Sequence, residues 1–247
     1  NARDINGLTA FMWACENGHK DVVQLLLDHS DRIELNTRTN SGWTSLMTAC
    51  KNGHKDVVQL LLDHSERMEL NARDKNGRTA FMWACFKGHR DVVQLLLDHS
   101  ERIELNARNN YGWTAFMYAC AEGRKDVVQL LLHSDTINEI NASNRQGITA
   151  FMWACSNGHK NIVQLLLEHS DTSIEINARC SDGGTALMRT CNNGHKDVVQ
   201  LLLEHSDTNI EINARNRQGM NAFMLACFNG HKSVVQYLLE YSDTNIE

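Results

Sequence analysis

The stretch that decides the fold runs from Thr9 to Ser30 and reads TAFMWACENGHKDVVQLLLDHS. Nearly the same letters return from Thr79 as TAFMWACFKGHRDVVQLLLDHS, and from Thr149 as TAFMWACSNGHKNIVQLLLEHS. Self-similarity at a fixed period indicates a repeat architecture, in which each copy is one small unit that cannot bury its apolar face alone. The function should then depend on the residues that differ from copy to copy.

Seven copies fill the 247 residues without a linker, and each begins at an asparagine. They span residues 1–35, 36–70, 71–105, 106–140, 141–176, 177–212 and 213–247, which predicts a single continuous array. Positions are counted below from the first asparagine of each repeat. Stacked side by side, such units form a continuous core and a solenoid.

Each copy reads as a turn, a helix, a tight turn, a second helix and a loop. In the first copy Asn6-Gly7 signals a turn, and Thr9 suits the N-cap of the first helix. Gly18 can adopt the left-handed conformation that ends a helix. The second helix places four apolar residues on one face: Val22, Val23, Leu26 and Leu27.

These residues resemble the ankyrin repeat family over the whole chain. Gly18-His19, Val22-Val23, Leu25–Leu27 and Leu35-Asn36 match the family's G-H, V-V, L-L-L and V-N elements. The chain departs from the family in Ala10, which replaces proline, in Met12, which replaces histidine, and in a loop two or three residues longer. The resemblance implies an all-α solenoid of stacked helix-turn-helix units, curved, whose turn tips and first helices line a concave, partner-binding face.

Composition narrows the class of protein. The net charge is -6, which argues against nucleic-acid binding driven by bulk charge, and no apolar run is long enough to span a bilayer. The first residues lack the features of a signal peptide. Seven of the eight cysteines recur once per repeat and no CxxC pair exists, which favours reduced thiols and an intracellular, cytoplasmic location.

The two ends keep the apolar pattern of the inner repeats. Copy one retains FMWAC and copy seven retains FMLAC, so neither terminal repeat has the polar outer face of a cap. We therefore expect a segment of a longer array, with end-to-end self-stacking possible through these repeats.

The cysteine and histidine four residues apart, such as Cys15 and His19, could suggest a metal or catalytic pair. Gly18 lies between them, and the fourth copy has Arg124 in the histidine position. We interpret the histidine as satisfying backbone groups at the start of the second helix. The chain also lacks GxxxxGK[ST], GxSxG, HExxH and EF-hand patterns, so we expect no enzyme activity, no metal and no cofactor.

The copies differ most at positions that the resemblance places on the concave face. All five tryptophans occur at the eighth or thirteenth position, and other aromatic and basic residues accompany them. The predicted partner-binding residues are Trp13, Trp43, Arg78, Trp83, Phe86, Tyr111, Trp113, Tyr118, Arg145 and Trp153. The alternative interpretation is that the indoles are packing residues between repeats.

Basic residues also concentrate at these positions, where thirteen are basic and five acidic. Six arginines at the third position could instead bridge neighbouring turns. We predict a non-enzymatic scaffold whose protein partner carries an apolar or aromatic segment flanked by acidic residues. Two alternatives remain: a ligand, nucleotide or single-strand binder that uses stacked Trp and Arg, and a passive elastic spacer.

Overall fold

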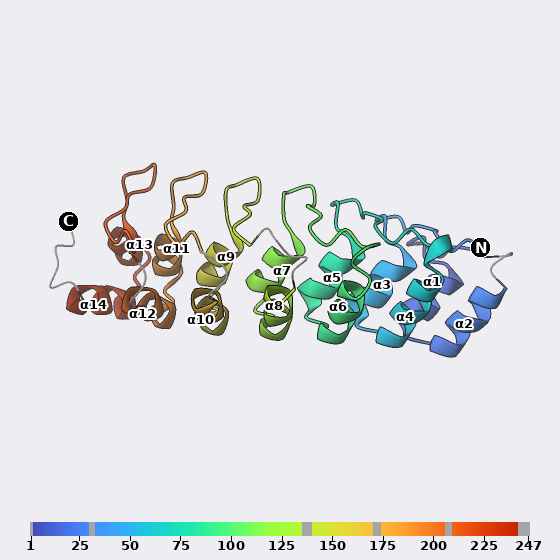
Figure 1. Cartoon of the computed structure of the whole chain (residues 1–247). Helices are drawn as coiled ribbons and strands as arrows, with labels where there is room; N and C mark the ends of the chain where they lie inside the picture. The colour runs from blue at the N-terminus through green and yellow to red at the C-terminus, as the bar shows by residue number, and fades with distance from the viewer. Residues whose placement is uncertain (1, 30–32, 135–139, 170–173, 206–208, 242–247) are drawn as a thin grey trace. The chain divides into compact units, whose positions relative to one another are not determined.

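The computed structural model describes residues 2–29, 33–134, 140–169, 174–205 and 209–241. Within these residues the chain forms fourteen α-helices and one short 3-10 helix, η1 (Ser65–Arg67), but no strands beyond two isolated bridges (Figure 1). The first helices of the repeats are α1 (Ala10–Glu16), α3 (Ser45–Asn52), α5 (Ala80–Lys87), α7 (Ala115–Ala121), α9 (Ala150–Ser156), α11 (Ala186–Asn193) and α13 (Ala222–Phe228). The second helices are α2 (Lys20–Asp28), α4 (Lys55–Asp63), α6 (Arg90–Leu97), α8 (Lys125–Leu132), α10 (Lys160–Glu168), α12 (Lys196–Glu204) and α14 (Lys232–Tyr241). The predicted all-α repeat solenoid is confirmed.

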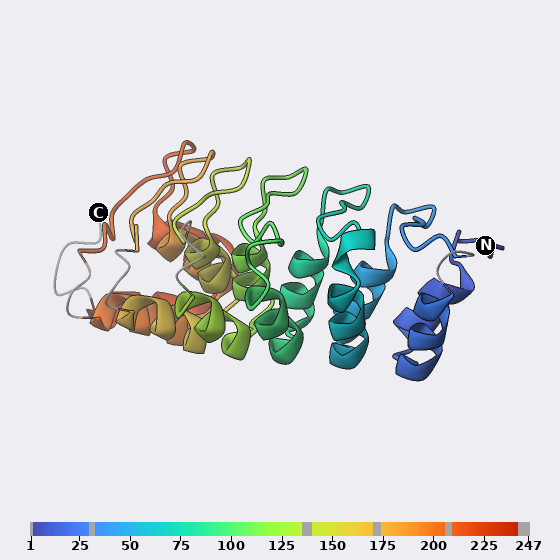
Figure 2. The ribbon, with the colours of Figure 1, turned by 45° about the vertical axis from the view of Figure 1, so that its right-hand side comes forward.

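The chain divides into two compact units. Unit 1 contains residues 1–119 and 129–138, and unit 2 contains residues 120–128 and 139–247. In unit 1, α1, α3 and α5 pack in one row and α2, α4 and α6 in another, while unit 2 repeats the arrangement with α9, α11, α13 and α10, α12, α14 (Figure 2). Within each of these sets, a first helix therefore contacts its own second helix and the first helix of the adjacent repeat.

Local sequence signals set the helix ends as predicted. The Thr9 hydroxyl accepts a hydrogen bond from the backbone N–H of Met12, and Thr79 does the same for Met82. Gly18 has a φ of 71°, in the left-handed region, so the chain turns directly into the second helix. His19 is the N-cap of α2 while Cys15 lies in α1, so the two side chains do not share a helix.

The core is built from the residues that scarcely vary between repeats. Met47 and Val58 are fully buried, as are the cysteines of the first helices in repeats one to six. The predicted apolar face of α2 is only partly buried, because Val22 remains 46% exposed. Its equivalents Val57 and Val92 are 1% exposed, since a preceding repeat packs over them.

Hydrogen bonds join each repeat to the next. The imidazole Nε2 of His54 donates to the carbonyl of Glu16 over 2.8 Å, and His89 donates to Lys51 over the same distance. The His54 side chain thus bonds a free carbonyl at the end of the preceding repeat's first helix. The prediction that it bonds backbone groups at the start of the second helix is wrong, because it makes no side-chain cap bond there. At the turn tips, the Asn40 N–H donates to the Asn6 carbonyl over 2.9 Å.

Candidate functional site

Five aromatic side chains of unit 1 form one continuous row, hereafter the aromatic row: Trp43, Trp83, Phe86, Tyr118 and Trp113. Ring centroids are 4.5 Å apart for Trp43 and Trp83, and 5.7 Å apart for Trp83 and Phe86. The row continues from Phe86 to Tyr118 over 5.7 Å and from Tyr118 to Trp113 over 4.9 Å. The eighth, thirteenth and sixteenth positions of repeats two to four therefore meet on one surface.

Burial differs along the row. Trp83 is only 7% exposed, and its buried indole N–H has no hydrogen-bond partner among the described residues. Trp43, Phe86, Trp113 and Tyr118 are half-buried. Trp83 therefore supports its neighbours by packing, which is the role that the alternative interpretation assigned to all the tryptophans. The half-buried rings are the ones that keep accessible surface.

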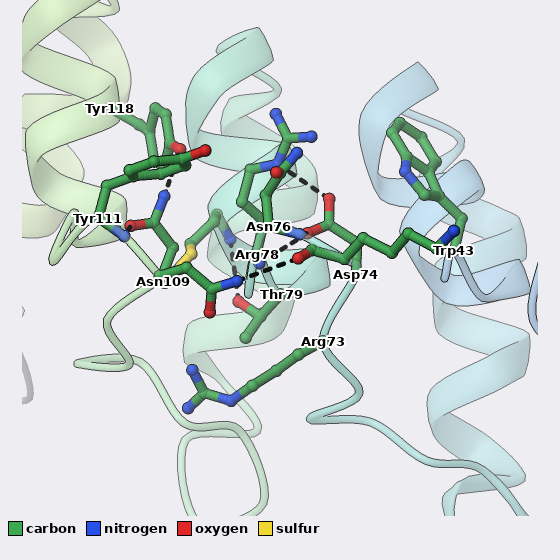
Figure 3. Close-up of polar contacts among 12 residues, drawn as sticks. Trp43, Arg73, Asp74, Asn76, Arg78, Thr79, Asn109, Tyr111 and Tyr118 are labelled. Carbon is green, nitrogen blue, oxygen red and sulfur yellow. Dashed lines mark hydrogen bonds and ion pairs between the residues drawn. The ribbon is translucent and has the colours of Figure 1, made fainter. Parts of the chain in front are cut away.

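A buried carboxylate fixes the cation beside Trp83. Asp74, at the fourth position of its repeat, accepts hydrogen bonds from the backbone N–H groups of Asn76 and Arg78. Its second oxygen accepts from the Arg78 guanidinium over 2.9 Å (Figure 3). The guanidinium lies 4.0 Å from the Trp83 ring centroid, a favourable cation–π geometry. Arg78 is therefore held by its own repeat.

Asn109 plays the corresponding part in the next repeat. Its Oδ1 accepts from the backbone N–H groups of Tyr111 and Trp113, and its Nδ2 donates to the Tyr118 hydroxyl over 2.8 Å (Figure 3). Burial raises the pKa of Tyr118, although nearby Arg78 and the Asn109 bond oppose the shift. The phenol therefore stays neutral and its orientation is fixed.

Two lysines lie over rings of the row. The Lys51 ammonium is 4.9 Å from the Trp43 centroid, and the Lys87 ammonium is 5.1 Å from that of Phe86. An open groove of about 620 Å³ borders Trp43, and Leu8, Lys51, Lys75 and Arg78 also line it. Its acidic lining residues are Glu16 and Asp74, and Asp74 is already bonded to Arg78. This end of the row combines aromatic surface with positive charge.

Four of the third-position arginines bridge neighbouring turns, as the alternative interpretation proposed. Arg38 donates to the Arg73 carbonyl over 3.0 Å and pairs with Glu69 over 2.6 Å. Arg73 and Arg179 repeat this double contact, and Arg3 makes the carbonyl bond. Much of the basic excess noted in the sequence is therefore engaged between repeats.

Trp13 and Tyr111 of unit 1 are 45% and 59% exposed. Tyr111 lies beside Tyr118 of the row and, in addition to burial, raises the pKa of that phenol (Figure 3). Arg145, which is exposed, and Trp153, which is half-buried, belong to unit 2. The structure thus brings together Trp43, Arg78, Trp83, Phe86, Trp113 and Tyr118.

The sequence prediction missed Asp74 and Asn109, which organise the site. A signal was present, because Asp, Asn or Thr occupies the fourth position of six repeats. Such side chains bond the backbone two residues on and shape turns. Asp4 and Asn144 use the same geometry elsewhere in the chain.

Several histidine side chains bond backbone carbonyls, and all the cysteines except Cys227 are buried. The His29 ring donates to the Leu25 carbonyl over 2.9 Å, at the end of α2. Across the described ranges, no three His, Cys, Asp or Glu side chains come together as a metal-binding group. In the same ranges, no helix is both long and apolar enough to cross a bilayer.

A protein-family model described as ankyrin repeats (3 copies) matches residues 1–74, 66–144, 137–216 and 170–247 of the chain. A comparison with curated proteins gives no match. Ankyrin repeats are generally protein–protein interaction modules and are typically non-enzymatic. With matches that extend from its first residue to its last, the chain belongs to the ankyrin repeat family.

Proposed function

We propose that this chain is a non-enzymatic protein-binding module whose partner segment lies along the aromatic row and the groove beside Trp43. The observation that carries the proposal is the row itself, because four of its five rings keep accessible surface. Tryptophan, tyrosine and arginine are the residues that most often dominate binding energies at protein interfaces.

The chemistry of the partner follows from the groove. Trp43 and Leu8 offer apolar contact, while Lys51 and Lys75 supply positive charge. An extended or helical segment with an apolar or aromatic residue and a flanking Asp or Glu complements both features. Arg78 contributes less to this charge, because Asp74 neutralises it.

Peptide display tests the proposal directly. A random peptide library is panned against the full chain, and recovered peptides are measured by fluorescence anisotropy. We expect enrichment of aromatic residues next to Asp or Glu. Trp43→Ala should weaken binding of such a peptide at least about tenfold, the effect of a modest hot-spot residue.

A matched control is available in unit 2. Lys196 lies 5.8 Å from the Tyr237 ring centroid, so Lys196→Ala with Tyr237→Ala removes an aromatic–lysine pair from second helices. That variant should bind the peptide normally, whereas Lys51→Ala with Trp43→Ala should not. Equal binding by both double variants would exclude the row as the site. Capture of short oligonucleotides in place of peptides would favour the single-strand alternative, and capture of neither would favour the spacer.

A further inference from the structure

A second hollow lies in unit 2, between repeats six and seven, and has a volume of about 340 Å³. Gly184 occupies the eighth position of repeat six, where repeats two to four have Trp43, Arg78 and Trp113. Gly184 lines the hollow and contributes no side chain to it, and the Asp182 carboxylate lies where its Cβ would stand. A hollow of this size is at the low end for ligand sites and suits a single side chain.

The cation of repeat six is placed on the helix instead of on the turn. Arg189 stands at the thirteenth position, and its Nη2 lies 3.1 Å from the Cys180 sulfur and 3.8 Å from an Asp182 oxygen. Among the described residues its buried Nε has no hydrogen-bond partner. The side chain as a whole remains 22% exposed, so part of it can still be contacted by a ligand.

Unit 1 shows which kind of side chain packs against an arginine guanidinium in this chain. There Arg78 lies 4.0 Å from the Trp83 ring, so one repeat supplies both the cation and the aromatic face. Repeat six has exchanged these residue types: glycine replaces the turn residue, and Arg189 replaces the indole. Phe228 also lines the hollow but is 81% exposed, and among the described residues no aromatic ring makes a cation–π contact with Arg189.

The rest of the lining suits an aromatic ring with a polar tip. Met188 and Leu225 are buried and give an apolar floor, and Met220 lies beside them. Asn192 and Asn216 also line the hollow and can donate to or accept from a hydroxyl, an indole N–H or a peptide group. Asp182 offsets the charge of Arg189, so a neutral ring fits better than a second carboxylate.

We infer that this hollow receives a tyrosine or tryptophan side chain of a partner polypeptide, which stacks on the Arg189 guanidinium. The inference rests on the proposed function, since it assumes a polypeptide partner, but it concerns different residues in a different unit. The two can therefore fail separately.

The test uses the full chain with ¹³C-labelled methionine methyl groups, because Met188 and Met220 line the hollow. N-acetyl-tyrosinamide is the probe, and N-acetyl-leucinamide is its aliphatic match. We expect saturable shifts of the Met188 and Met220 signals with tyrosinamide, and shifts at least threefold smaller with leucinamide. Equal shifts with both probes, or no shift of these two signals, would overturn the inference.

Three variants locate the bound ring. Gly184→Trp should fill the hollow from within and abolish the shifts. Gly184→Ala requires the Asp182 carboxylate to move, because the new Cβ would lie 2.8 Å from its Oδ1, but it adds little volume and should retain the shifts. Arg189→Lys keeps the charge but loses the planar face, and should weaken binding about threefold to tenfold. Unchanged binding by Arg189→Lys would overturn the stacking even if Gly184→Trp failed to fold.

The source of the ring is tested with p-cresol, which carries the tyrosine ring without peptide groups. Weaker binding of p-cresol than of N-acetyl-tyrosinamide supports a polypeptide ligand. Equal binding would make the hollow a site for free small aromatics and would overturn the inference, while leaving the aromatic row of unit 1 untouched.

Discussion

At the scale of the residue, Asp74 connects the turn of repeat three to the aromatic row. It is 5% exposed, and its two oxygens accept three hydrogen bonds, two from backbone N–H groups and one from Arg78. The guanidinium that it holds covers Trp83. One carboxylate therefore shapes a turn and orients a cation at the surface.

Replacing Asp74 with asparagine separates these two roles. Asp74→Asn keeps an oxygen for the backbone bonds but loses the negative charge opposite Arg78. We expect the free energy of unfolding, measured in urea, to fall by about 1–3 kcal/mol, because the half-buried Arg78 guanidinium then lacks its carboxylate partner. Asp4→Asn is the matched control, since Asp4 makes the same two backbone bonds in an exposed turn with Leu8 in place of arginine. Equal losses of stability in both variants would show that the Asp74–Arg78 ion pair adds nothing beyond the backbone bonds.

The cysteines provide a second prediction at this scale. Burial raises the pKa of Cys191 to about 12 and holds that of Cys50 well above its ordinary value of 9.0, whereas Cys227 is exposed. Because the thiolate is the reactive form, a disulfide reagent at pH 8 should modify the exposed Cys227 rapidly and the six buried cysteines of the first helices only after unfolding in urea. Cys227→Ser should remove the rapid phase. Since those six buried thiols keep their protons above pH 9.0 in the folded chain, they also contribute stability that is lost as the pH rises further.

At the scale of the element, the first helices are short and depend on their ends. Helix α5 has eight residues, too few to be stable alone in water. Thr79 caps its start and Gly88 ends it in the left-handed region, so each boundary is fixed by one residue. The aromatic row is carried on such helices and on the turns before them.

Removal of one cap should therefore cost stability. Thr79→Ala leaves the Met82 N–H without its acceptor, and we expect a loss of about 1 kcal/mol in the free energy of unfolding. Thr79→Asn should restore most of it, because Asn221 already caps α13 through Met224 over 2.9 Å. Thermal unfolding followed by circular dichroism measures both variants. If Thr79→Asn is no more stable than Thr79→Ala, the Thr79 side chain stabilises the helix through packing and not through the cap bond.

At the scale of the whole molecule, stability depends on contacts between neighbouring repeats. In stacked repeats it is approximately the sum of repeat and interface terms. Gly53 reports on one interface, because its φ is 78° and a Cβ there would lie 2.5 Å from the His89 ring. Gly230 occupies the equivalent position of repeat seven with a φ of 71°, and a Cβ there would meet nothing within 4 Å.

A comparison of the two glycines isolates the interface. Both Gly53→Ala and Gly230→Ala carry the strain of a left-handed alanine, which costs about 1 kcal/mol. Gly53→Ala should cost more, because it also displaces the ring that bonds Lys51. Urea unfolding of both variants gives the difference, and equal values would mean that the histidine contact contributes nothing to the stacking.

The sequence predicted the repeats, the helix pairs and their caps, because these follow from local signals that recur seven times. It also predicted that tryptophans would gather, but not which would be buried. Trp83 packs against Trp43 of the preceding repeat as well as under Arg78 of its own, and the contact between copies cannot be read from one copy alone. The hollow beside Gly184 could not be predicted from the sequence either, because its existence depends on where the residues around the glycine lie.

The bonds made by the arginines have a consequence for how the chain can grow. Arg38 reaches a carbonyl 35 residues ahead, and Arg179 reaches the equivalent carbonyl 36 residues ahead, so the bond follows the repeat and not a fixed separation. A duplication or deletion of one whole repeat in the gene would still place each such donor opposite an equivalent acceptor. The number of repeats can therefore change during evolution while the same arginine–carbonyl contact between repeats is kept. The aromatic and glycine positions can meanwhile diverge in each new copy.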